Sequence, residues 1–71
     1  MTDLNALRQR MTDSGMTVKA IAQKSGILRE TLYNRLNGTT EFNASEILAL
    51  SDTLRLTVKE RDAIFFAREV E

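Results

Sequence analysis

Apolar residues recur along this chain with the spacing of amphipathic helices. Leu4, Leu7 and Met11 follow an i, i+3, i+7 pattern, and Leu32 and Leu36 follow an i, i+4 pattern, so each set lies on one helix face. The alternation of apolar and polar residues that is typical of strands is absent. The pattern predicts an all-α fold of five helices, over about residues 3–14, 17–25, 28–37, 43–55 and from 57 onward.

Residues that cap helices stand at the start of three of these segments. The hydroxyl of Thr17 can accept a hydrogen bond from an amide in the first turn of the helix that follows it. Asn43 is followed three residues later by Glu46, and Thr57 by Glu60, which is the spacing of a capping box. Each cap of this kind stabilises a helix by about 0.5–2 kcal/mol, which is a large share of the stability of a small domain.

The segment 17–38 has the composition of a helix-turn-helix. Ala22 is small enough to let two helices approach closely, and Gly26 tolerates the positive φ that the corner between them needs. Ile27 can pack beneath that corner, and Leu32 can hold the second helix against the first. In such a motif the opposite, polar face of the second helix enters the major groove of DNA, and here that face carries Arg29, Glu30, Tyr33 and Asn34.

This pattern resembles the helix-turn-helix family of phage repressors and Cro proteins over about residues 4–66. The matching residues are Ile21, Ala22, Gln23, Gly26, Ile27, Leu32, Asn37 and Gly38. The resemblance implies a five-helix bundle of the phage-repressor DNA-binding-domain type, with residues 1–71 as a single domain and the motif at about 17–38. It also implies a transcriptional regulator in the cytoplasm of a bacterial host cell, which binds double-stranded operator DNA as a homodimer in the control of lysis and lysogeny.

The same resemblance implies a set of DNA-contacting residues. They are Thr17, Val18, Gln23, Arg29, Glu30, Tyr33, Asn34, Asn37 and Thr39. Among them, Arg29 can bond guanine with two hydrogen bonds, Asn34 can pair with adenine, and Glu30 can accept from the cytosine amino group. Thr17 and Val18 would place the amides of a helix N-terminus near a phosphate, where the positive end of the helix dipole favours an anion.

The charges of the chain are divided unevenly between its two halves. Ten basic and ten acidic residues give a net charge of zero. Residues 1–38, however, contain six basic and three acidic side chains, whereas residues 39–71 contain four basic and seven acidic ones. A polyanionic partner is therefore expected to bind the first half.

The residue types that most catalytic and metal sites need are missing from the sequence. It contains no histidine and no cysteine, and no glycine-rich phosphate loop. We therefore expect no enzymatic activity, no metal and no cofactor. The first residues also lack the basic-then-apolar pattern of a signal peptide, and no apolar run approaches the roughly 20 residues that a membrane-spanning helix needs, so we expect an intracellular protein.

Three features favour an alternative function in another class. Leu28 stands where the family usually has a Ser, Thr or Asp cap, Glu30 places a negative charge close to phosphates, and the net charge is zero. A protein-interaction module of the same fold, which binds a partner repressor, would fit these features. Its candidate contact residues are Leu28, Arg29, Tyr33, Phe65 and Phe66. Two adjacent phenylalanines cannot share one narrow helix face, so one is expected in the core and the other at the surface.

Overall fold

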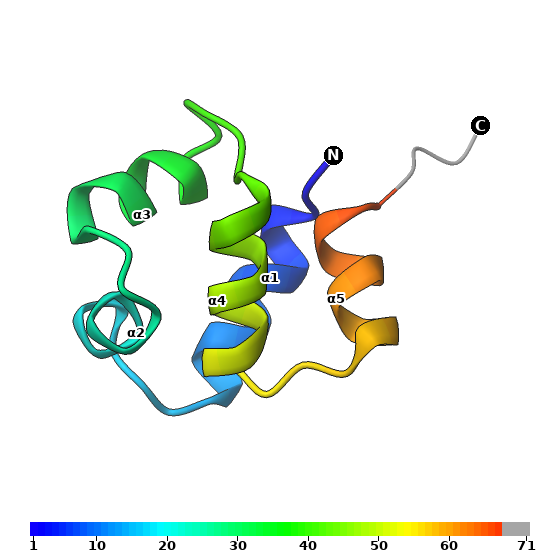
Figure 1. The fold of residues 1–71 in the computed structure, drawn as a ribbon, viewed down its shortest axis with the longest axis horizontal. Coiled ribbons are helices and arrows are strands. Elements are labelled where there is room, and N and C mark those ends of the chain that lie inside the picture. Colours follow the sequence, from blue (N-terminus) through cyan, green and yellow to red (C-terminus); the bar gives the residue numbers. More distant parts are fainter. Residues whose placement is uncertain (68–71) are drawn as a thin grey trace.

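Five helices form the chain in the computed structural model, which describes residues 1–67 (Figure 1). They are α1 (Leu4–Asp13), α2 (Val18–Ser25), α3 (Arg29–Leu36), α4 (Ala44–Thr53) and α5 (Val58–Phe65). Within these described residues there is no strand, and no helix is long and apolar enough to cross a membrane. The predicted all-α, five-helix fold is confirmed. Each helix begins one residue later than predicted because its cap residue lies outside the hydrogen-bonded turns.

Polar side chains cap four of the five helices at their N-termini. These caps are Asp3, Thr17, Asn43 and Thr57. Both predicted capping boxes are present. In the α4 box the backbone amide of Glu46 donates to Asn43 Oδ1 at 2.8 Å, and the backbone amide of Asn43 donates to Glu46 Oε1 at 3.0 Å. The exception is α3, whose N-cap residue Leu28 offers no side-chain hydrogen bond.

The hydrophobic core takes side chains from all five helices. Its largest fully buried side chains are Leu7, Ile21, Leu32 and Leu50, one from each of the first four helices. Phe65 of α5 meets Phe42, which precedes α4, in an edge-to-face contact with ring centroids 5.4 Å apart. These contacts place the inner faces of all five helices around one centre, as the apolar pattern of the sequence requires.

The helix-turn-helix and α5 lie at opposite ends of the long axis, with α1 and α4 between them (Figure 1). The backbone amide of Asp3, just before α1, donates to the carbonyl of Ile64 in α5 at 2.7 Å and so joins the first helix to the last. An ion pair between Arg10 and Glu60, with a nitrogen-to-oxygen distance of 3.6 Å, also links α1 to α5. Because α5 packs against α1 and α4, it leaves the outer surfaces of α2 and α3 uncovered.

Ser51 is a weak point of the core. Its side chain is buried in α4, and its hydroxyl has no hydrogen-bond partner among the described residues. Ser51→Ala should therefore raise the free energy of unfolding by about 1 kcal/mol, since it removes an unsatisfied buried hydroxyl and improves helix propensity. Urea denaturation followed by circular dichroism measures this change. The control is Ser45→Ala at an exposed position, which should change the free energy of unfolding by no more than about 0.5 kcal/mol. A loss of stability in Ser51→Ala would show that the hydroxyl has a partner, such as a buried water.

Candidate nucleic-acid interface

A short corner, Gly26–Leu28, joins α2 to α3. Gly26 has a φ of 75°, in the left-handed region, and the amide of buried Ile27 donates back to the Ala22 carbonyl at 3.2 Å. A connection of this length, with a glycine at the corner, is typical of a helix-turn-helix. In that motif the second helix lies in the major groove, so α3 is the candidate recognition helix.

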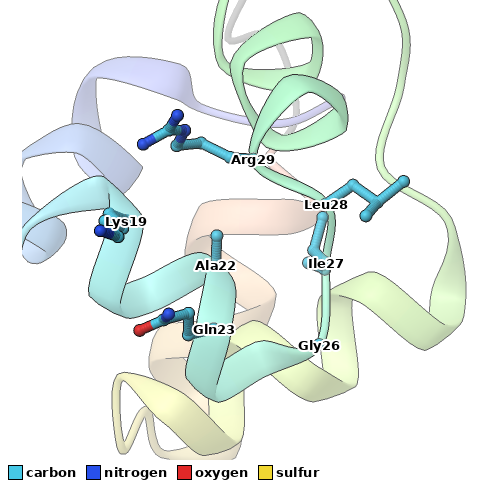
Figure 2. Close-up of a pocket in the computed structure, with 7 residues that line it drawn as sticks. All are labelled: Lys19, Ala22, Gln23, Gly26, Ile27, Leu28 and Arg29. Carbon is cyan, nitrogen blue, oxygen red and sulfur yellow. The ribbon is translucent and has the colours of Figure 1, made fainter.

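An open hollow of about 460 Å³ lies where the end of α2 meets the start of α3. It is lined by Lys19, Ala22, Gln23, Gly26, Ile27, Leu28 and Arg29. Figure 2 shows Arg29 extending from α3 toward the side of α2, where Lys19 and Gln23 lie, while Leu28 extends in the opposite direction. Two lining residues are cationic and none is a carboxylate, so the hollow suits an anionic ligand such as the sugar-phosphate backbone.

The outer face of α3 carries the residues that the sequence assigns to base contacts. Arg29, Glu30 and Asn34 are exposed, and the structure shows no ion pair between the first two and any described residue. Tyr33 is 47% exposed and therefore lies at the surface rather than in the core. Because Leu32 is buried on the other side, the helix presents this polar face outward as a unit.

The remaining predicted contact residues lie at the two ends of the helix-turn-helix, at the start of α2 and just after α3. The hydroxyl of Thr17 accepts from the Ala20 backbone amide at 3.0 Å, and Val18 packs half-buried against the core. Because a hydroxyl that accepts one hydrogen bond can still donate its proton, Thr17 can offer a phosphate both its O–H and its backbone amide, whereas Val18 can offer only its backbone amide. At the other end, Asn37 is exposed and is hydrogen-bonded to Arg8 at 3.4 Å, and Thr39 is exposed in the loop after α3.

A family model described as the Cro/C1-type HTH DNA-binding domain matches residues 6–60. This range includes α1 to α4 almost completely, the whole helix-turn-helix and the start of α5. The chain belongs to the Cro/C1-type HTH DNA-binding domain family. No curated protein and no solved structure matches the chain. Family membership makes double-stranded DNA the ligand class of this domain.

The residues proposed from the sequence for a protein partner do not form one patch on this Cro/C1-type domain. Leu28 and Phe66 are exposed, by 75% and 54% respectively, but they stand at the start of α3 and the end of α5, at opposite ends of the molecule (Figure 1). Phe65 is 2% exposed, and its assignment as a partner contact is wrong because it packs on Phe42 in the core. One phenylalanine of the pair is thus in the core and the other at the surface, as the helix geometry predicts.

An ion pair that the sequence did not reveal fixes α3 against α4 in this Cro/C1-type domain. Arg35 donates to both carboxylate oxygens of Glu46, at 2.8 and 3.1 Å, and also to the hydroxyl of Thr40. The two charged side chains are only 19% and 12% exposed. Glu46 also closes the capping box with Asn43, so a single carboxylate stabilises the start of α4 and the orientation of the recognition helix.

The Arg35–Glu46 pair makes the stability of the domain dependent on pH in the acidic range. The Arg35 guanidinium, supported by the Asn43 amide, holds the pKa of the Glu46 carboxyl below its ordinary value. The stability that Glu46 contributes is then complete above its unfolded-state pKa of about 4.3, and it is lost as the pH falls through the lower folded-state value. The melting temperature should be nearly constant between about pH 5.5 and 7.5, because the chain contains no histidine that would titrate in this range. It should fall below about pH 4.5.

Glu46→Gln separates the contribution of the Arg35–Glu46 pair to the pH dependence of stability from the contributions of the other carboxylates. Glutamine can still close the capping box with Asn43 but cannot form the charged pair with Arg35. The variant should be less stable than the wild type at pH 7 and should lose less stability on acidification. Equal losses in the two proteins between pH 7 and pH 3 would contradict the role given to Glu46.

Lys19 is a candidate contact residue that the sequence pattern did not single out. It precedes Gln23 by one helical turn, so both lie on one face of α2, and both line the hollow beside Arg29. The i, i+4 spacing from Gln23 was the signal that could have identified it. Lys19 strengthens the cationic character of the interface on this DNA-binding domain.

Proposed function

We propose that this chain regulates transcription by inserting α3 into the major groove of an operator that has two-fold symmetry. The observation that supports this most directly is the continuous surface formed by the cationic hollow and the exposed polar face of α3. The hollow suits phosphates, while Arg29, Glu30 and Asn34 offer donors and acceptors for guanine, cytosine and adenine. The interface therefore has one part for positioning and one part for sequence recognition.

Two copies of the chain would bind such an operator together. One helix-turn-helix contacts only a few base pairs, and two half-sites about one helical turn apart raise both affinity and specificity. Phe66 is the exposed apolar residue at the end of α5, away from α2 and α3, and is our candidate contact between the two copies. The resemblance to phage repressors and Cro proteins supports a role in lysis–lysogeny control within a bacterial cell.

A selection experiment tests this function and identifies the operator sequence at the same time. The purified chain selects duplexes from a random-sequence pool, and the enriched duplex is titrated at 50 and 200 mM salt against a scrambled duplex of equal length. We expect a sequence with two-fold symmetry, whose affinity falls about 10³-fold over this salt range if roughly six phosphates are contacted. No enrichment, together with equal weak binding to both duplexes, would overturn the proposal.

A second function, the binding of a partner repressor protein, is favoured by one feature of α3. Its start carries Leu28, 75% exposed, next to Arg29, and Tyr33 is 47% exposed one turn further on. Exposed apolar, aromatic and arginine side chains on one short helix end are the residue types that protein interfaces favour. Under this function the DNA titration would give only a non-specific background, and a repressor protein would bind with little dependence on salt.

A further inference from the structure

Leu28 departs from two local rules in a domain that otherwise obeys them. It has the highest exposed fraction, 75%, of the large hydrophobic side chains described. It also occupies the only N-cap position of the five described helices that forms no side-chain hydrogen bond. A Ser, Thr, Asn or Asp at this position would stabilise α3 and remove exposed apolar surface. A residue that leaves a helix uncapped and exposes apolar surface, without a visible gain within the fold, points to a functional contact.

The position of Leu28 shows which part of a ligand it meets. It is at the N-terminal end of α3, the end from which a recognition helix contacts base edges. It borders the cationic hollow, and it also lines a second hollow of about 300 Å³ on the side of α4, together with Thr31, Ser45, Glu46 and Ala49. Since Leu28 and Arg29 extend to opposite flanks of the helix end (Figure 2), they would meet different base pairs in a groove about 12 Å wide.

We propose that Leu28 determines sequence specificity by packing against the 5-methyl group of a thymine in the major groove. This inference rests on the proposed operator-binding function. The thymine methyl is the apolar group that the edges of the four bases offer in the major groove, and aliphatic side chains contact it. Lys19 and Arg29 are the charged residues of the hollow that Leu28 borders, and the Glu46 carboxylate on its other side is already paired with Arg35. This balance of charge favours a polyanion over an apolar protein surface as the ligand.

Replacement of thymine by deoxyuridine tests this contact, because it removes the methyl group and leaves every hydrogen-bonding group in place. The probe is the duplex that the wild-type chain enriches from a random pool, with one thymine changed at a time in one half-site. At one position the change should weaken wild-type binding about four-fold, which corresponds to the loss of one buried methyl group. In Leu28→Ala the same change should have no further effect, while the variant itself binds the thymine duplex several-fold more weakly.

Two further variants separate recognition from folding. Val58→Ala removes apolar surface from an exposed residue of α5, at the other end of the molecule, and should keep the full difference between thymine and deoxyuridine. Leu28→Ser should raise the melting temperature, because it supplies the missing cap, and yet lose that difference. If Leu28 had only a structural role, Leu28→Ser would not become more stable and at the same time lose the difference in affinity between thymine and deoxyuridine.

The outcomes distinguish this inference from the function on which it rests. If the wild type enriches a duplex and no thymine responds to deoxyuridine, the contact is overturned and operator binding stands. The same holds if the deoxyuridine effect persists undiminished in Leu28→Ala. If the wild type enriches no duplex, operator binding itself fails and the thymine contact fails with it.

Discussion

Leu32→Ala should leave a large fraction of the molecules unfolded at 25 °C. Leu32 is fully buried in α3, and its side chain holds the recognition helix on the core. Truncation of a buried leucine to alanine costs about 2.7–5 kcal/mol, because it loses buried area and leaves a cavity. A single core in a chain of this size supplies only about 3–5 kcal/mol of stability, so the variant has little left. Circular dichroism at 222 nm, with urea titration of both proteins, measures the loss.

The matched control is the same substitution at Leu48. Leu48 is on α4 and 60% exposed, so Leu48→Ala should change the free energy of unfolding by no more than about 0.5 kcal/mol. The comparison keeps the chemistry of the substitution constant and changes only the burial of the site. A Leu32→Ala protein that melts within a few degrees of the wild type would show that α3 is not held by this residue.

Arg29→Ala and Lys19→Ala should weaken DNA binding in two different ways. Arg29 lies at the start of α3 in the position of a base contact, and its loss should cost about 1–3 kcal/mol, roughly 5- to 150-fold, on the enriched duplex. The scrambled duplex should be affected far less, so the specificity ratio falls. Lys19 lies on α2 beside the hollow and should contact phosphate. Its loss should weaken binding to both duplexes by similar factors and lower the salt slope by about one per copy.

Titrations of both variants on both duplexes, at several salt concentrations, give these quantities directly. Arg61→Ala serves as the control, because it also removes a cation but stands on α5, where Arg61 pairs with Asp62 at 3.0 Å. It should leave affinity, specificity and salt slope close to those of the wild type. If Arg29→Ala weakened both duplexes equally, Arg29 would be a phosphate contact, and base recognition would have to come from other residues of α3.

The sequence by itself determined the helices, their caps and the corner of the helix-turn-helix. These features depend on neighbours along the chain: the apolar period of about 3.6 residues defines a helix face, and a cap acts within three residues of its partner. Asn43 with Glu46 and the glycine at position 26 are examples, and the structure confirms all of them. The outward polar face of α3 followed from the same periodicity, because the buried leucines fix which face is outside.

Only the tertiary structure decided which residues share a surface. The pair between Arg35 and Glu46 joins residues 11 positions apart on different helices, and no local rule links them. Phe65 was separated from Phe66 by the packing of α5 on Phe42, and Leu28 proved to be exposed because no helix covers the start of α3. Side-chain burial and long-range ion pairs depend on how helices are placed in space, and that placement is set by the packing of the whole core rather than by any one segment.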